Sequence, residues 1–280
     1  TFASMKEQNI NPIIQQDYKL GLALSGGGAR GFAHLGAIRA IEEVGLKPDI
    51  VAGVSAGSVI AVLYGAGVPV DDIMSAFTDR KFSDFANVNL RINANQGLFD
   101  FSKFKNFIAE MVAPYVNLED LPIPTFVGVT DFDHGVPTEF HNGNIADAVA
   151  ASCSIPICFR PQIINGVSYV DGGVLRNMPS WIIRSRCQRL IGVNCSPLLS
   201  TDTSNDSLLE IAMRAYNLMA KANQAFDMDM CDLAVETPQL ANYKVFNLKE
   251  INKVFISGYA TMKKALKEVD WLSELQAENK

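Results

Sequence analysis

One serine of the sequence stands in a pattern that is typical of nucleophilic enzymes. The stretch VAGVSAGSVIAV at 51–62 contains GVSAG, with Ser55 at its centre, between a strand-like apolar run and a helix-like run. In that setting G-x-S-x-G predicts a nucleophile elbow, a sharp strand-to-helix turn that exposes the serine hydroxyl. A free hydroxyl is a poor nucleophile near neutral pH, so this serine needs a neighbouring base.

The histidines do not supply an obvious base. The chain has only His34, His134 and His141, so no histidine lies downstream of residue 141. His34 falls in the first turn of a predicted helix, where packing or capping is the ordinary role. Asp131 or Asp133 followed by His141 has the order of an α/β-hydrolase triad, but acid and histidine would then share one short hairpin.

A carboxylate is the other candidate base. Asp171 ends a predicted strand and precedes Gly172 and Gly173, so its side chain can project from a tight turn into a cleft. An ordinary Asp-Gly turn is the alternative interpretation. If Asp171 contacts the hydroxyl of Ser55, it can take the proton without an imidazole, and partial burial would raise its pKa to suit that task.

A glycine-rich turn precedes the serine by one predicted helix. GGGARG at 26–31 satisfies G-x-G-x-x-G, so a Rossmann-type dinucleotide site must be considered. That site needs an acidic residue at the end of the second strand, where this chain has Ser55, and Asp49 lies at the opposite end. Converging backbone N–H groups suit instead the oxyanion of an acyl-transfer intermediate. The glycines concerned are Gly26, Gly27 and Gly28.

The elements around these motifs alternate as in a parallel sheet covered on both faces. We expect strands at 20–25 and 48–53 and helices at 31–44 and 56–64, joined by short links. Turns that follow adjacent parallel strands open at the same edge of the sheet, so the glycine loop and the serine would face one another. Arg30 either braces this loop or meets a substrate anion.

The rest of the chain is expected to complete the same domain. We divide it into an N-terminal lead (1–18), a catalytic core (19–200) and C-terminal helices (201–280). A phenylalanine-rich stretch from Phe77 to Phe107 either lines an acyl-chain channel or lid, or forms the core of a helical cap. Further strands are expected at 124–132, 166–170, 189–194 and, as an edge strand, 244–246, and further helices at 145–152, 208–226 and 256–275.

The composition excludes several classes of protein. A net charge of −6 and a pI near 5.1 argue against general affinity for nucleic acid and against broad adhesion to anionic membranes. Five cysteines, an odd number without a C-x-x-C pair, indicate free thiols in a reducing compartment, and we expect a cytoplasmic protein. No apolar run approaches the ~20 residues that span a bilayer. The chain starts at Thr1, so a removed leader stays open.

Together the motifs resemble the patatin-like phospholipases and lipid acyl hydrolases, over roughly residues 19–195. The similar segments are SGGGARG at 25–31, GVSAG at 53–57, ASCSIPICFRP at 151–161, DGG at 171–173 and NMP at 177–179. The resemblance implies an α/β fold with three α/β/α layers and a mainly parallel central sheet. It also implies a Ser–Asp dyad of Ser55 and Asp171, an oxyanion hole at the three glycines, and no metal or cofactor. The supporting motif residues are Arg30, Gly31, Gly53, Gly57, Gly172 and Gly173.

The implied activity is hydrolysis of carboxylic ester bonds in phospholipids, lysophospholipids or acylglycerols through an acyl-enzyme. The implied partner is a lipid ester, with transient contact to a membrane surface, and no nucleic acid. This sequence has DGG where many members have DGA, and we expect no consequence. The alternatives are a non-catalytic lipid-binding or regulatory protein and a Rossmann-type nucleotide-binding protein.

Overall fold

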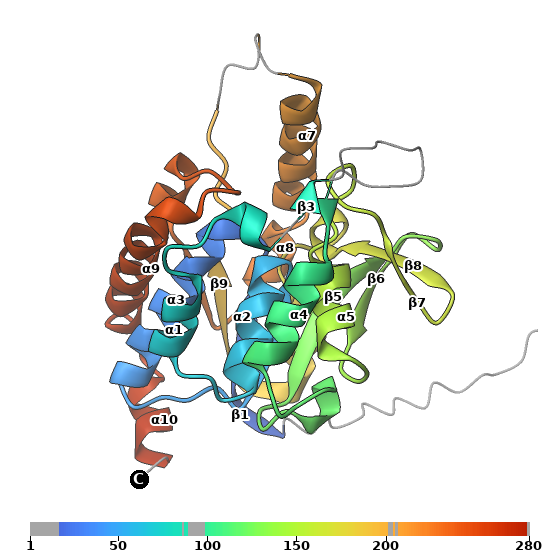
Figure 1. Ribbon diagram of the computed structural model, residues 1–280. Coiled ribbons are helices and arrows are strands. Elements are labelled where there is room, and N and C mark those ends of the chain that lie inside the picture. The colour runs from blue at the N-terminus through green and yellow to red at the C-terminus, as the bar shows by residue number, and fades with distance from the viewer. Residues whose placement is uncertain (1–16, 86, 89–98, 201–203, 205–206, 279–280) are drawn as a thin grey trace, which may run out of the picture.

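A mixed β-sheet runs through the computed structural model, which describes residues 17–85, 87–88, 99–200, 204 and 207–278 (Figure 1). In this part of the chain the sheet has eight strands in the order β10-β9-β1-β2-β5-β8-β7, with β6 paired to β5. The strands from β10 to β5 are parallel, whereas β6, β7 and β8 run antiparallel to their neighbours. The strands are β1 (Tyr18–Leu24), β2 (Ile50–Val54), β5 (Thr125–Asp131), β6 (Val136–Phe140), β7 (Gln162–Ile164), β8 (Val167–Asp171), β9 (Cys187–Asn194) and β10 (Leu233–Glu236).

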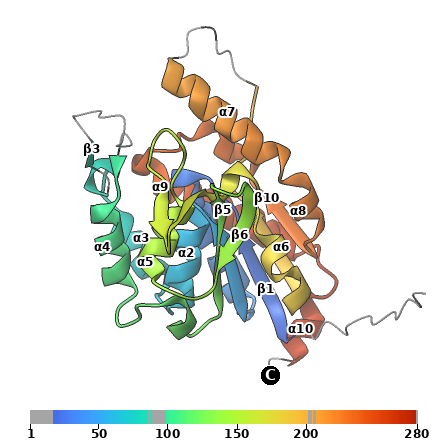
Figure 2. The same ribbon diagram turned by 90° about the vertical axis from the view of Figure 1, so that its right-hand side faces the viewer.

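Helices cover the sheet on both faces, as expected (Figure 2). The central strands β2 and β5 are buried along their whole length, which is typical of strands that are covered on two sides. One face carries α1 (Phe32–Glu43), α2 (Ala56–Gly65) and α5 (Ile145–Ser152), and the other carries α6 (Ser180–Ile183) and α8 (Ala225–Asp229). The predicted three-layer α/β fold with a mainly parallel sheet is therefore confirmed.

The 71–116 region supplies two helices and a small hairpin beside the sheet. The helices are α3 (Val70–Phe77) and α4 (Ser102–Met111), and β3 (Asn87–Val88) pairs with β4 (Phe99–Asp100). Aromatic rings hold these pieces together, because the Phe107 ring lies 5.0 Å from that of Phe77 and 4.9 Å from that of Phe85. Such edge-on ring pairs add stabilisation beyond the area that they bury.

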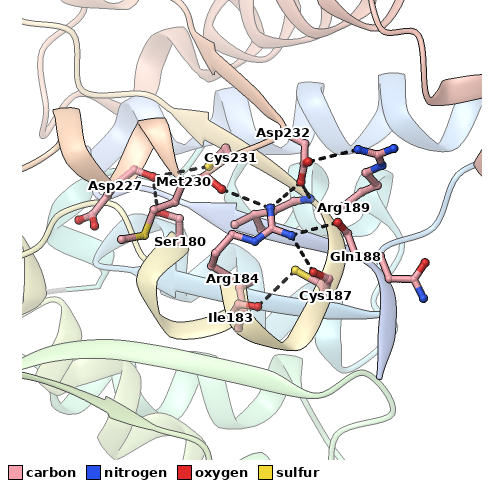
Figure 3. Close-up of polar contacts among 11 residues, drawn as sticks. Ser180, Ile183, Arg184, Cys187, Gln188, Arg189, Asp227, Met230, Cys231 and Asp232 are labelled. Carbon is pink, nitrogen blue, oxygen red and sulfur yellow. Dashed lines mark hydrogen bonds and ion pairs between the residues drawn. The ribbon is translucent and has the colours of Figure 1, made fainter. Parts of the chain in front are cut away.

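Polar contacts join the chain segments on the face of the sheet that carries α6 and α8 (Figure 3). Arg184 donates from Nη2 to the carbonyl of Cys187 at 2.7 Å and from Nη1 to that of Met230 at 3.2 Å. The same guanidinium pairs with Asp232, whose carboxylate also accepts from the backbone N–H of Leu190 at 2.7 Å. These contacts tie the segment after β8 to the start of β10.

Three expectations for the C-terminal part are wrong. The helix predicted at 208–226 is two helices, α7 (Leu208–Ala222) and α8, because the chain turns at Asn223. The edge strand lies at β10, whereas residues 244–246 form a loop in which the carbonyl of Val245 accepts the N–H of Ala29 at 2.7 Å. The closing helix is also divided, into α9 (Ile251–Leu266) and α10 (Leu272–Glu278), with Trp271 buried between them.

Helix α7 projects from the body of the molecule, and its capped first turn is the end that points away from the body (Figure 1). Ser207 and Glu210 form a capping box that satisfies backbone donors at its start. No described helix is both apolar enough and long enough to cross a membrane. The division of the chain at residues 18 and 200 stays a prediction, and most of its N-terminal lead (1–16) lies outside the described residues.

Helices α1 and α9 pack with their backbones in contact, which makes a glycine necessary in each. A Cβ atom at Gly258 would lie 2.6 Å from the Cα of Ala33, and one at Gly36 would lie 2.6 Å from the backbone nitrogen of Tyr259. We expect Gly258→Ala to lower the free energy of unfolding by about 1–3 kcal/mol, because overpacking exceeds the ~1 kcal/mol gain in helix propensity.

Urea unfolding monitored by circular dichroism measures this loss. The matched control is Ala260→Ser on the exposed face of α9, expected within about 0.5 kcal/mol of the wild type. A Gly258→Ala protein as stable as the wild type would show that the two helices can separate without cost.

Candidate active site

Ser55 occupies a strained turn between β2 and α2. Its backbone has φ 52° and ψ −124°, a conformation that costs a non-glycine residue about 1–3 kcal/mol. The turn is held by hydrogen bonds: the N–H of Ser55 donates to Ser152 Oγ at 2.8 Å, and that hydroxyl donates to the carbonyl of Gly128 at 2.7 Å. The predicted elbow geometry is present, and Ser152 is a supporting residue that we did not expect.

The glycines on both sides of the serine allow close backbone approaches. A side chain at Gly57 would strike the carbonyls of Leu24 and Ser25, and one at Gly53 would strike the carbonyl of Gly57. A side chain at Gly31 would likewise strike Ala56, because its Cβ would lie 2.7 Å from the Cβ of Ala56. These glycines bring the first and second strand-to-helix turns into contact, as their spacing predicted.

Strand β5 brings Asp171 to the serine. Val54, the last residue of β2, pairs with Gly128, and Asp171, the last residue of β8, pairs with the next residue, Val129. Because β6 occupies the other edge of β5, β2 and β8 share one edge and meet end to end. Asp171 therefore stands where β2 would have continued, beside Ser55.

The carboxyl group of Asp171 is fully buried, and burial raises its pKa to about 6. Three donors oppose that rise: the Ser55 hydroxyl, the N–H of Gly173, which lies 2.8 Å from Oδ1, and the Tyr216 hydroxyl. Oδ2 has no hydrogen bond of regular geometry to any described residue. The nearest turn glycine, Gly172, packs against the carbonyl of Gly128, so the turn is as tight as its sequence suggested.

The glycine loop lies against the serine. A Cβ at Gly26 would be 3.2 Å from that of Ser55. The N–H of Gly26 is already donated to the carbonyl of Asn177 at 3.2 Å. The N–H groups of Gly27 and Gly28 have no acceptor among the described residues, and Gly28 has φ +59°. The loop thus offers two free donors where we expected three.

His34 lies beneath this loop, where it cannot act on the serine. Its ring is fully buried, with Nε2 2.8 Å from the carbonyl of Ser25 and 3.3 Å from Cys195 Sγ. Since a carbonyl only accepts, Nε2 carries the proton and Nδ1 does not. Burial lowers the pKa of His34 to about 4, so the ring is neutral at physiological pH. Its role is to hold the loop.

The other triad candidates lie apart from the serine. His134 contacts Asp131 through Nδ1 at 2.9 Å, in the hairpin between β5 and β6. Asp133 accepts the N–H of Ser168 at 2.8 Å, and the His141 ring lies 5.6 Å from that of Phe126, tilted by 34°. None of the three histidines, all within the described residues, makes a hydrogen bond with Ser55. The hairpin triad is therefore not assembled.

Arg30 braces the loop by hydrogen bonds to backbone carbonyls. Its Nε donates to the carbonyl of Tyr243 at 2.8 Å and its Nη1 to that of Pro197 at 3.2 Å.

The acidic residue of a dinucleotide site is absent from the end of β2. Asp49 accepts the backbone N–H groups of Lys19 and Leu20 at the opposite edge of the sheet. The position that a dinucleotide ribose would need is thus occupied by Ser55.

An apolar cavity of about 140 Å³ opens at Ser55. The loop residues Gly28 and Gly31 and the thiol-bearing Cys153 line its polar end. Several rings of the phenylalanine-rich stretch are core residues and also line this cavity, and their role as an acyl-chain channel or lid stays a prediction. The side chain of Phe99 lies outside the described residues. The apolar lining comprises Phe32, Val59, Ile60, Phe77, Phe82, Phe85, Phe101, Phe104, Ile155, Phe159, Val245, Phe246 and Leu248.

Cys153 and Tyr216 were not recognised from the sequence. The Cys153 thiol contacts the hydroxyls of Ser55 and Ser58, and burial and the charge of Asp171 raise its pKa far above the ordinary value. All five cysteines are free, as expected, and three are buried. The ASCSIPICFRP segment was a usable signal for Cys153, but nothing near Tyr216 resembled a motif.

Known proteins are similar to this chain in sequence, and a solved structure is similar in fold. The family model for patatin-like phospholipase matches residues 22–182. An NTE family protein of Mycobacterium tuberculosis is 32% identical over 164 residues, which are 58% of this chain and 44% of that protein. The neuropathy target esterase of Drosophila melanogaster is 28% identical over 198 residues, 66% of this chain and 13% of that protein. The chain thus spans less than half the length of these curated relatives.

A solved structure shows the same architecture. VipD from Legionella pneumophila superposes with a TM-score of 0.52 over 90% of this chain and 67% of its own, at 15% sequence identity. At that identity the likeness concerns the fold alone. It agrees with the mixed sheet and the helices on both sides described above.

The neutral state of His34 makes the stability of the fold depend on pH. Its folded pKa of about 4 lies below the ordinary value near 6.5, so unfolding takes up a proton between these values and stability is lost as pH falls. We expect His34→Gln, whose amide can still donate to Ser25, to reduce the loss between pH 7 and 4.5 by about 2 kcal/mol.

Urea unfolding at the two pH values measures the difference. His141→Gln, at an exposed ring, is the control and should keep the pH dependence of the wild type. An unchanged loss in His34→Gln would mean that the buried ring is not kept neutral.

Proposed function

The chain belongs to the patatin-like phospholipase family, and from this premise we propose that it hydrolyses carboxylic esters of lipids through Ser55 and Asp171. The observation that carries the proposal is the placement of a strained serine beside a buried carboxylate at the mouth of an apolar cavity. Each part has a task in acyl transfer, and none of the three histidines makes a hydrogen bond with the serine.

The first half of the proposed reaction forms an acyl-enzyme. Ser55 Oγ attacks the carbonyl carbon of the ester, and its proton passes to the carboxylate of Asp171. The oxyanion accepts the N–H groups of Gly27 and Gly28, each such donor being worth about 3–4 kcal/mol of barrier. The N-terminus of α2, directly after Ser55, favours the same negative charge.

The second half returns the site to its starting state. The ester bond breaks as Asp171 gives its proton to the leaving alkoxide, which departs as an alcohol. Water then attacks the acyl carbon while Asp171 takes one of its protons. Collapse of this second intermediate releases the fatty acid and returns that proton to Ser55.

The pKa of Asp171 fits a carboxylate that works without histidine. A base is most effective when its pKa lies near the working pH, and burial brings this pKa to about 6. At neutral pH the group is therefore mostly ionised, yet it is a stronger base than an exposed aspartate.

The cavity supports a lipid substrate. Its lining is almost entirely aliphatic and aromatic, which suits an acyl chain with its carbonyl at Ser55. We therefore propose phospholipids, lysophospholipids or acylglycerols as the substrate class. A lipid-binding protein without turnover would use the same cavity, but it would need neither the strained serine nor the buried carboxylate.

A fluorophosphonate probe tests the dyad directly. We expect the wild type to be labelled and Ser55→Ala to be unlabelled. Asp171→Asn should lose at least about a thousandfold in ester turnover, because the hydroxyl then has no base. Thermal melting should show that both variants remain folded.

The hairpin variant His141→Ala is the control for the base, with turnover expected near that of the wild type. If His141→Ala were inactive and Asp171→Asn active, the dyad would be wrong. Fatty acid binding without any turnover on phospholipid, lysophospholipid, monoglyceride and nitrophenyl esters would favour the lipid-binding alternative.

The length of the cavity should set the preferred acyl chain. Val59→Phe places a larger side chain in the cavity lining, in the first turn of α2 after Ser55. We expect kcat/KM for long-chain relative to short-chain nitrophenyl esters to fall about tenfold or more. Losing contact with two methylenes costs about 0.8 kcal/mol each, and about 1.4 kcal/mol corresponds to tenfold.

The matched control is Val116→Phe, at a side chain that is 59% exposed. This control should leave the ratio of kcat/KM values unchanged. An equal fall for all chain lengths in Val59→Phe would show that the acyl chain lies elsewhere.

A further inference from the structure

We propose that Tyr216, on helix α7, is a positioning residue of the active site: its hydroxyl, which lies at the turn after Asp171, donates a hydrogen bond to the Asp171 carboxylate and so orients that carboxylate beside Ser55. The inference rests on the proposed role of Asp171. It adds a residue from beyond 22–182, the part of the chain that the family model matches.

Helix α7 presents two different faces. Met213 and Tyr216 pack against the hydrophobic core, and Met213 Sδ lies 3.5 Å from Cys158 Sγ. The opposite face is open to solvent, with Ile211 and Leu218 each 50% exposed. Tyr216 therefore lies on the face that covers the active site.

The turn after Asp171 is shaped around the tyrosine. A Cβ at Gly173 would fall on the hydroxyl of Tyr216, and it would lie 2.9 Å from Asn177 Oδ1 and 3.2 Å from Asp171 Oδ1. An alanine here, as in many family members, would thus displace the phenol. On this proposal the second glycine of DGG makes room for the phenol, whereas we had expected no consequence of DGG in place of DGA; that expectation stays a prediction, which the Gly173→Ala variant tests.

A second contact fixes α7 on the same turn. Asn223, which follows the last residue of α7, donates from Nδ2 to the carbonyl of Gly173 at 3.4 Å. Its Oδ1 accepts the N–H of Asn177 at 3.0 Å. Asn223 and Tyr216 thus contact the turn after Asp171 at two points, and these two contacts fix the position of the phenol.

The phenol can act only as a donor. Burial and the neighbouring charge of Asp171 raise the pKa of Tyr216 well above its ordinary value, so it stays protonated throughout the working range. A hydrogen bond to the ionised carboxylate lowers the pKa of Asp171 against the effect of burial. It also leaves the Ser55 hydroxyl free to point toward substrate without leaving the carboxylate unsatisfied.

The test compares pH profiles of the full chain on a soluble short-chain nitrophenyl ester. In the wild type the acidic limb of kcat/KM should lie near pH 6, where Asp171 becomes ionised. In Tyr216→Phe we expect this limb to move up by about one pH unit and the plateau to fall about tenfold. Gly173→Ala, which displaces the phenol, should move the limb in the same direction.

The matched control is Tyr64→Phe, at another buried tyrosine at the far end of α2 from Ser55. Its limb should coincide with that of the wild type. A Tyr216→Phe profile that is lowered but keeps its limb at the wild-type pH would overturn the inference and leave Tyr216 a packing residue. Absence of Ser55-dependent hydrolysis in the wild type would instead refute the proposed function.

A second readout does not need turnover. Removing a donor from an ionised carboxylate weakens the fold more than removing it from a neutral one. The unfolding equilibrium constant of Tyr216→Phe relative to the wild type should therefore be about tenfold larger at pH 7.5 than at pH 4.5. The same ratio at both pH values would contradict a hydrogen bond to ionised Asp171, whatever the enzyme activity.

Discussion

The active site depends on one strand edge that two strands share. β2 and β8 approach the same edge of β5 from opposite directions, and they meet between Gly128 and Val129. Ser55 and Asp171 are the residues at that junction. Because the hydrogen-bond register of β5 sets both positions, the pair is placed by the rigid centre of the sheet and not by flexible loops.

The same junction explains why so many glycines surround it. Three turns lie there: the loop at Gly26, the elbow at Ser55 and the turn at Gly172. A Cβ at Gly26 would lie 3.2 Å from that of Ser55, and one at Gly172 would lie 2.8 Å from the carbonyl oxygen of Gly128. Convergence also excludes water, which leaves the Asp171 carboxylate buried and raises its pKa. The hydrogen-bond donors that lower the pKa of Asp171 against the effect of burial are therefore as much a part of the site as the carboxylate itself.

In the half of the chain that bears the motifs, the helices and strands lie close to the ranges expected from the local sequence pattern. Helices at 56–65 and 145–152 lie within one residue of the expected ranges, because apolar periodicity and flanking glycines or Asn144 mark their ends. The C-terminal half did not. The amphipathic pattern at 208–226 continues through Asn223, so only the contacts of that side chain with Gly173 and Asn177 explain why α7 ends there.

Local sequence was sufficient to identify Ser55, the glycine loop and Asp171 as candidate groups, because tight turns, close backbone approaches and elbows require particular residue types at short spacing. It could not show that His34 holds the loop, that the N–H of Gly26 is already donated, or that the Tyr216 hydroxyl lies against Gly173. These facts depend on contacts between residues far apart in the chain. Such contacts are set by how the sheet and helices pack, and no short-range pattern encodes them.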